Sequence, residues 1–415
     1  MHSVKSVGPA GSPSLLRQIN SAAVLRAVRQ GGPVSRPEIA RLTGLSRPTV
    51  NGVVDELLRA GYFLEHPSDG STDARKPGPR PRLVGFRADL GYVLGLDIGA
   101  NKLLAVVADL DGRVLASKRR RAVDLGGADE VVVAASETAR AALARAGVVT
   151  SQLIATAVGT PGVVELPSGR ITLAPQIPGW EGLPLAERLA ETLGRPVLAD
   201  NEVHLALIAE RWLGAIQGVE DALYIQLGIG IGAGILIGGQ LYRGATGAAG
   251  EICYLPLVDS GLTPPDGVGQ FEHAAGGRAF TRLGRRAAAS ARGALLREMA
   301  GGDPASVDAE IIFGAALQGD PAAQGVVEEL VCRLARGVAT AAVLLNPAVV
   351  VVGGGLSRAG QALLEPLERT VRDLVPVPPR FVLSSLGDEA VALGAVRTAL
   401  DAADDGLLTY VRGST

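Results

Sequence analysis

Residues 92–109 read YVLGLDIGANKLLAVVAD and residues 222–239 read ALYIQLGIGIGAGILIGG, and these two stretches decide the fold. Each consists of an apolar run, a glycine-containing turn and a second apolar run, which is the pattern of two buried strands joined by a tight turn. The two units begin about 130 residues apart, and a unit that recurs at such a spacing indicates a duplicated domain.

Stretches with helical character alternate with these strands. They lie at residues 128–146 and 184–193, and again within 281–300 and 322–345. This alternation predicts an α/β fold. A third glycine run, VVVVGGGLS at residues 349–357, ends a buried strand at the place where a ligand crevice is expected. Each glycine turn alone could be an ordinary tight turn, but backbone N–H groups in such turns also allow close approach by phosphate.

The charge of the chain is unevenly distributed. The 415 residues carry a net charge of −2, yet the first 82 residues carry +6 and the remainder −8. A basic head on an acidic body indicates a polyanionic partner for the head alone. The length and the 47% hydrophobic content predict two or three domains.

Cysteine usage and hydropathy exclude several protein classes. Two cysteines, Cys253 and Cys332, are too few for a disulfide framework or a cysteine-rich zinc site. Residues 337–357 are uncharged over a membrane-spanning length, but Asn346-Pro347 and the triple glycine 353–355 break them into a helix end, a strand and a loop. Because the N-terminus also has no apolar stretch, we expect a cytoplasmic protein without a membrane segment.

The basic head has the signature of a helix-turn-helix. Residues 14–30 form an amphipathic helical pattern with Ile19 expected on its inner face, and Ser35 to Glu38 matches a capping box. Gly44 ends the short helix that follows, and Ser46 caps a third helix that runs to about Ala60. The second helix of such a pair enters the major groove of DNA with its N-terminus first.

A wing follows these helices. Residues 62–64 and 82–86 read as two strands, and residues 68–81 between them are polar, proline-rich and basic. The alternative is a three-helix module with a solvated linker, but the capped turn, the basic wing and the charge split together favour DNA binding. The candidate DNA contacts are Arg36, Ser46, Arg47, Thr49 and Asn51 in the helices and Arg75, Lys76 and Arg80 in the wing.

Four segments carry a resemblance to a known family. They are AVGTPGVV at 157–164, APQIPGWEGLPLAERL at 174–189, PVLADNEVHLALIAERWLG at 196–214 and LYRGATGAAGEICY at 241–254. From about residue 14 to residue 400 the chain resembles the ROK family of repressors, open reading frames and sugar kinases, and specifically its repressor branch. The resemblance implies an actin-like, two-lobed sugar-kinase body with a ribonuclease H-like fold. The expected domains are a winged helix-turn-helix at 1–87, a first lobe at 88–200 and a second lobe at 201–415, with a ligand cleft between the lobes.

The resemblance also implies a carbohydrate site in that cleft. Paired carboxylates and an amide suit a polyol, because adjacent hydroxyls each give and accept a hydrogen bond. The alternative is that Glu251 is a surface residue and Asn201 a turn residue. The implied sugar contacts are Gly159, Pro161, Gly162, Asn201, Glu202, Glu251, Tyr254 and Glu272.

The nucleotide side of the implied site is preserved only in part. The residues that match the kinase pattern are Asp97, Gly99, Lys102, Gly230, Gly353, Gly354 and Gly355. The Gly-Thr-Lys of the first phosphate turn is replaced by Ala100-Asn101-Lys102, and the threonine of the second turn is Ile229. We therefore interpret this part as a vestigial nucleotide site.

Two further departures argue against catalysis and zinc binding. Glu202, whose side chain is one methylene longer, stands where the kinases have their catalytic aspartate, and His204 stands where they have a later asparagine. Tyr254 stands where the family has its zinc-binding histidine, and residues 261–270 contain none of the cysteines that complete the family's zinc site. We expect no catalytic residue, no metal and no cofactor. We interpret His204 as either a ligand contact or a satisfied core histidine, and Trp180 and Trp212 as packing residues.

These features together predict a sugar-responsive DNA-binding transcriptional regulator of the repressor type. Its expected partners are a small carbohydrate and a palindromic operator bound by a homodimer or higher oligomer, with no membrane. The alternative is a DNA-binding sugar kinase that retains ATP-dependent phosphoryl transfer, which Asp97, Gly99 and Lys102 leave open. An interaction module without DNA binding conflicts with the wing and the charge split.

Overall fold

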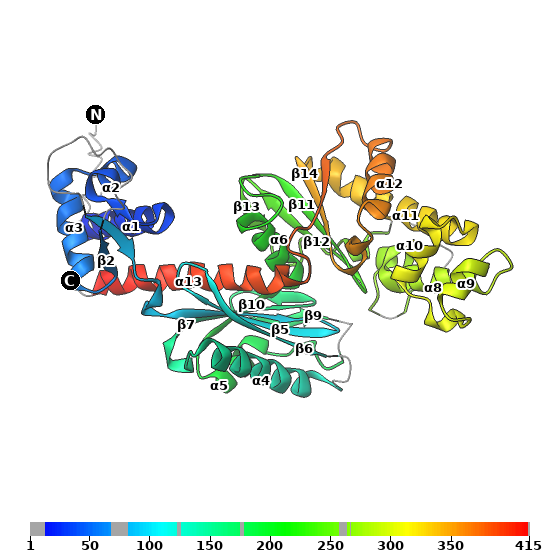
Figure 1. Cartoon of the computed structure of the whole chain (residues 1–415), viewed down its shortest axis with the longest axis horizontal. Helices are drawn as coiled ribbons and strands as arrows, with labels where there is room; N and C mark the ends of the chain where they lie inside the picture. The colour runs from blue at the N-terminus through cyan, green and yellow to red at the C-terminus, as the bar shows by residue number, and fades with distance from the viewer. Residues whose placement is uncertain are drawn as a thin grey trace, which may run out of the picture.

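The structure is a computed structural model, and it describes residues 13–67, 82–122, 126–174, 178–256, 264–265 and 267–413. Figure 1 shows a small head at one end of the molecule and two α/β lobes beside it. The long C-terminal helix runs from between the lobes to the head. This arrangement confirms the predicted α/β body with an N-terminal winged helix.

The head is a three-helix unit with a small antiparallel sheet in the order β1-β3-β2. Its elements are α1 (Pro13–Gly31), β1 (Val34–Ser35), α2 (Arg36–Thr43), α3 (Arg47–Arg59), β2 (Phe63–His66) and β3 (Leu83–Phe86). Val28, Ile39, Val54 and Leu57 are among the side chains that form its core. The predicted wing tip at 68–81 lies outside the described residues.

Local capping explains the turn between α2 and α3. Ser35 Oγ accepts a hydrogen bond from the Glu38 N–H at 3.4 Å, and Ser46 Oγ accepts one from the Thr49 N–H at 3.3 Å. Gly44 ends α2 with φ of 70°, a conformation that favours glycine. The expected inward position of Ile19 is wrong. This side chain is 55% exposed, and the first buried side chain among the described ones of α1 is Ser21.

The first lobe contains a five-stranded sheet in the order β10-β7-β4-β5-β6. Its strands are β4 (Tyr92–Ile98), β5 (Lys102–Asp109), β6 (Val114–Arg121), β7 (Leu153–Thr160) and β10 (Val197–Asn201), with a separate hairpin of β8 (Val163–Glu165) and β9 (Arg170–Leu173). The helices α4 (Ala128–Ala146) and α5 (Leu185–Leu193) cover one face of the sheet. Side chains alternate between the two faces, so that Leu94 and Leu96 face these helices while Val93 faces the other way.

The second lobe repeats this topology in the order β13-β12-β11-β14-β15. Its strands are β11 (Ala222–Leu227), β12 (Ile231–Ile237), β13 (Gln240–Tyr242), β14 (Val349–Gly353) and β15 (Arg380–Leu383). In both sheets an antiparallel three-stranded meander is followed by two parallel strands. The duplication predicted from the two glycine turns is therefore confirmed.

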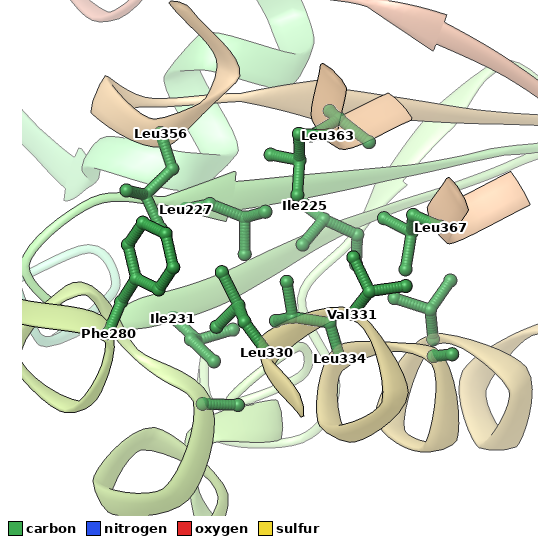
Figure 2. Close-up of a cluster of buried hydrophobic side chains, with 14 of the residues drawn as sticks. Ile225, Leu227, Ile231, Phe280, Leu330, Val331, Leu334, Leu356, Leu363 and Leu367 are labelled. Atoms are coloured by element: carbon green, nitrogen blue, oxygen red, sulfur yellow. The ribbon is translucent and has the colours of Figure 1, made fainter. Parts of the chain in front are cut away.

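Helices on the outer face of the second sheet build the largest core cluster. These helices are α7 (Gln270–Ala275), α8 (Gly277–Ala288), α9 (Ala294–Met299), α10 (Ala309–Leu317), α11 (Pro321–Leu345) and α12 (Gln361–Arg372). Figure 2 shows Ile225 and Leu227 of β11 meeting Leu330 and Leu334 of α11. Short 3-10 helices are η1 (Ala88–Leu90), η2 (Thr150–Gln152), η3 (Ile252–Tyr254), η4 (Pro304–Ser306), η5 (Gly355–Ala359) and η6 (Gly387–Glu389).

The apolar stretch 337–357 is divided as predicted. Helix α11 ends at Leu345, Asn346 caps it with φ of 46°, and β14 then runs into the glycine turn. Among the helices in the described ranges, none combines the length and the apolar character needed to cross a bilayer.

Two helices fill the space between the two sheets. These are α6 (Glu202–Trp212) and α13 (Ala390–Gly413), and they share one core cluster with the inner faces of both sheets. A Cβ at Gly394 would overlap the carbonyl oxygen of Leu205, and a Cβ at Gly95 would overlap that of Ala392. Glycine therefore lets α13 approach α6 and β4 at backbone distance.

The predicted domain limits remain a prediction, but α13 adds a feature that a linear division does not include. This helix belongs to the range 201–415 expected for the second lobe, yet it packs on β4 and β7 of the first. A helix that returns across the junction in this way binds the two lobes together.

Candidate functional site

A cleft of about 1630 Å³ lies between the lobes. It is lined by the β4–β5 turn and the start of α6 from one side, and by the Gly228–Gly232 turn, the segment 250–254 and α7 from the other. The predicted residues that line it are Asp97, Gly99, Lys102, Pro161, Gly162, Asn201, Glu202, Gly230, Glu251, Tyr254, Glu272, Gly354 and Gly355. The fold thus brings the implied sugar and nucleotide residues to one cavity.

Two predicted glycines lie behind the cleft wall instead. A Cβ at Gly159 would overlap the side chain of Val391, and a Cβ at Gly353 would overlap the phenol of Tyr224. Neither glycine is among the lining residues. Close packing therefore accounts for both glycines without a ligand.

One end of the cleft is rich in carboxyl groups. Burial, together with the neighbouring charge of Asp97, raises the pKa of Glu202 from 4.5 to about 8. Burial also raises the pKa of Glu251 and of Glu272, whose Oε2 accepts a hydrogen bond from the Ile231 N–H at 3.3 Å. At neutral pH the Glu202 carboxyl is therefore mainly protonated, and it can donate a hydrogen bond as well as accept one.

Asn201 has a structural role at the start of α6. Its Oδ1 caps the helix by accepting from the Val203 N–H at 2.7 Å, and its Nδ2 donates to the Gly162 carbonyl at 2.8 Å. An amide has two donor and two acceptor positions, so one of each remains for a ligand. The same two bonds fix the loop that carries Pro161 and Gly162 against α6.

Asp97 and Lys102 form an ion pair close enough to Glu202 for both charges to act on its carboxyl group. Lys102 Nζ lies 2.9 Å from Asp97 Oδ2 and also donates to the carbonyl of Asp388. Arg119 pairs with the Asp388 carboxylate at 3.0 Å. Burial raises the pKa of Asp97, and the Lys102 charge opposes this shift. These contacts join the β4–β5 turn to the segment that leads into α13.

A buried charged network next to the cleft was not predicted from the sequence. Arg243 Nη2 lies 2.7 Å from Asp200 Oδ2, and His204 Nδ1 lies 2.9 Å from Asp200 Oδ1. Burial disfavours ionisation of Asp200, but His204 and Arg243 outweigh it and lower the pKa of this carboxyl. The other ring nitrogen of His204 lies 3.4 Å from the Ala249 carbonyl oxygen, so the network holds the loop that ends at Glu251.

This network favours the core interpretation of His204. Both ring nitrogens have protein partners and the side chain is buried, as in a satisfied core histidine, although His204 also lines the cleft. The Asp200–His204 spacing of four residues across a helix start was the available signal. Trp180 is likewise a packing residue. It is fully buried, and its indole N–H donates to Thr160 Oγ1 at 2.8 Å.

Tyr254 replaces the histidine that the family resemblance implied as a zinc ligand. Its hydroxyl donates to the Gly267 carbonyl at 3.2 Å. Within the residues that the structure describes, His, Cys, Asp and Glu side chains form no group of three that could hold a metal ion. The absence of zinc remains a prediction.

The cleft also has basic lining residues. They include Arg278, Arg285 and Arg286 of α8 and Arg358 of η5, and the Arg278 charge opposes the rise in the pKa of Glu272. In the described ranges these four guanidinium groups form no ion pair with a carboxylate. The cleft therefore offers carboxyl groups suited to hydroxyl groups and arginines suited to an anion.

The predicted DNA contacts of the head differ in how free their side chains are to reach DNA. Arg47 and Asn51 are exposed on its outer side, and the hydroxyls of Ser46 and Thr49 lie 2.8 Å apart in a hydrogen bond. Arg36 instead pairs with Asp55 at 2.7 Å and with Glu65 at 3.5 Å, so its guanidinium is held within the head. Arg75, Lys76 and Arg80 of the wing lie outside the described residues.

Comparison with known protein families gives two matches. The ROK family profile matches residues 93–402, and the MarR family profile matches residues 17–70. The putative xylose repressor of Caldicellulosiruptor sp. (strain Rt8B.4) is 31% identical over 393 residues, which cover 93% of this chain and 96% of that protein.

Two solved structures are similar to this one. A ROK family transcriptional regulator, a homologue of the E. coli MLC protein, aligns with a TM-score of 0.76 at 23% identity over 96% of this chain and 100% of that one, which shows a shared fold. A ROK family glucokinase from Streptomyces griseus, in complex with glucose and AMPPNP, aligns with a TM-score of 0.67 at 30% identity over 75% of this chain and 100% of that one.

The raised pKa of Glu202 predicts a pH-dependent stability. Between about pH 5 and pH 8 the folded protein keeps a proton that the unfolded chain has lost, so the free energy of unfolding should fall as pH rises through this window. Glu202→Gln cannot titrate, and its Tm should therefore rise relative to the native Tm between pH 5 and pH 8.5. Thermal unfolding of both proteins across this range measures the difference. Parallel pH profiles for the two proteins would contradict the assignment.

Proposed function

Since the chain belongs to the ROK family, we propose that it is a transcriptional repressor whose affinity for DNA responds to a sugar bound between its lobes. The observation that carries this proposal is the presence of a carboxyl-lined cleft and a winged helix in one chain. A relative named as a putative xylose repressor extends over 93% of the chain, and D-xylose is accordingly the first sugar to test.

Sugar recognition would take place at the carboxyl end of the cleft. Glu251 and Glu272 offer acceptor oxygens, and protonated Glu202 offers a donor as well. Asn201 adds one free donor and one free acceptor position. Such a mixed set fits the adjacent hydroxyls of a monosaccharide, each of which both donates and accepts.

The same end of the cleft is poorly suited to phosphoryl transfer. A general base must be ionised and within hydrogen-bond reach of the hydroxyl it activates, whereas Glu202 is mainly protonated at neutral pH. Asn101 and Ile229 also remove hydroxyl groups from the two phosphate turns. We therefore propose that the chain binds its sugar without phosphorylating it efficiently.

DNA binding would use the exposed start of α3. Arg47 and Asn51 lie where a recognition helix contacts base edges, and the Ser46 cap fixes the helix start. A symmetric homodimer would present two heads to a palindromic operator. The wing residues Arg75, Lys76 and Arg80 would add contacts to phosphates.

A second candidate function, a DNA-binding sugar kinase, is favoured by the arginines that line the cleft. Arg278, Arg285 and Arg286 could receive the phosphates of a nucleotide beside the intact Asp97–Lys102 pair. The two functions differ in turnover, because sugar binding alone needs no ionised base.

Glu251→Gln should weaken sugar binding by at least roughly tenfold, because an amide replaces a carboxyl that has two acceptor oxygens. Operator binding without sugar should not change, since Glu251 is in the body. Isothermal calorimetry with D-xylose and a panel of monosaccharides measures the affinity, and Glu187→Gln on the exposed face of α5 is the matched control. Unmodified protein with no affinity for any sugar of the panel would contradict the sensor assignment.

Phosphoryl transfer from radiolabelled ATP to the best-bound sugar should be undetectable or several orders of magnitude slower than in a ROK kinase assayed beside it. Glu202→Asp alone should not restore transfer, since Asn101 and Ile229 still leave phosphate poorly held. Robust transfer by the unmodified protein would select the kinase function instead.

Arg47→Ala should reduce operator affinity roughly 5- to 150-fold and relax the base preference at one position of each half-site. Gel-shift titration against the operator and single-base variants measures both effects. Arg145→Ala, at the exposed end of α4 in the body, should leave both unchanged. Equal affinity of the Arg47→Ala and native proteins would rule out α3 as the recognition helix.

A further inference from the structure

An arginine of the head makes polar contacts with the body. Arg29, near the end of α1, pairs with Asp404 of α13, and its side chain is only 13% exposed. The same guanidinium donates to the carbonyl of Leu110, and it lies 4.9 Å from the centre of the Phe86 ring. One head residue is thus bonded to the last helix and to the β5–β6 turn.

The surroundings of Arg29 make this contact part of both cores. Phe86 packs against the head cluster and also against the cluster between the two lobes. The Leu110 N–H donates to the carbonyl of Ala88 at 3.1 Å, which ties the turn to the segment that joins head and body. Asp111 and Asp401 also lie close enough to act on the Arg29 charge.

Helix α6 leads from this junction to the cleft. It begins at Glu202 among the cleft carboxyl groups and ends at Trp212. The Trp212 ring lies against Gly112 of the β5–β6 turn and 5.7 Å from the Arg397 guanidinium of α13. Contact therefore continues from the cleft, along α6, to the turn and the helix that hold Arg29.

Helix α13 is a second connection between the cleft and the junction that holds Arg29. It follows η6, whose residues Gly387 and Asp388 line the cleft. Glu210 of α6 is fully buried and accepts hydrogen bonds from Ser384 Oγ at 2.6 Å and from the Leu386 N–H at 3.2 Å. Because Gly394 also brings α13 against Leu205, the two helices are held to each other, and α13 continues to α1 of the head.

We propose that Arg29 is the positioning residue that couples the cleft to the DNA-binding head. This inference rests on the proposed function, because it assumes that the cleft holds the effector. A shift of α6 and α13 upon ligand binding changes the positions of Asp404 and Leu110, and the bonds of Arg29 carry the head along. Without these bonds, the cleft and the head each keep their own function and lose only their coupling.

The test compares Arg29→Met and Asp404→Asn with the native protein. Methionine keeps the apolar stem of the side chain and removes its charge. Both variants should bind D-xylose with native affinity. The fold change in operator affinity that D-xylose causes should be at least tenfold smaller than in the native protein. The double variant should lose no more than Arg29→Met alone, because that change already removes the contact with Asp404.

Arg17→Met is the matched control. Arg17 also lies on α1, but it is 59% exposed and pairs with Glu56 of the head at 3.0 Å. This variant should keep the native response to D-xylose. A native-size response in Arg29→Met or Asp404→Asn would overturn the proposal.

A second measurement needs no sugar. Hydrogen exchange at the Leu110 amide should become at least tenfold faster in Arg29→Met than in Arg17→Met, because the junction loses its anchor. If the native protein does not respond to D-xylose, the proposed effector is contradicted, but the role of Arg29 at the junction is not. Hydrogen exchange at the Leu110 amide then tests that role. Unchanged protection of Leu110 would overturn the role of Arg29.

Discussion

The close crossing of α6 and α13 is the constraint on which the rest of the structure depends. The two helices fill the space between two sheets of identical strand order, and they meet at Gly394, where a side chain would overlap the Leu205 backbone. Because interiors are close-packed, this contact fixes the separation of the sheets and hence the width of the cleft. Any change that spread the helices would alter the ligand site and the head junction together.

The second determinant is the cost of placing several carboxyl groups in one partly buried cleft. Water is removed from Glu202, Glu251 and Glu272, and the response is an upward shift of their pKa values. A neutral, hydroxyl-rich ligand suits such a site better than an anion does. The arginines of α8 that line the same cleft favour an anion instead. The cleft thus offers groups of two different chemistries, and one fold builds both.

Much of the fold could be predicted from the sequence because its signals are local. The strand pairs around Gly99 and Gly230 and the serine caps at Ser35 and Ser46 depend on residues a few positions apart. Contacts between distant residues could not be predicted in this way. Arg243 reaches Asp200 across 43 positions, and Arg29 joins the first helix to the last. Motif order placed most of the candidate residues in one cleft, but whether Gly159 packs or binds was visible only in three dimensions.

The dual role of Phe86 has an evolutionary consequence. The head has a complete core of its own, and Phe86 is shared between that core and the body. A recombination event could therefore exchange heads between related chains, provided that the incoming head kept an aromatic ring at this boundary and a cation opposite Asp404. New operator preferences could then arise on an unchanged sensor, without any redesign of the cleft.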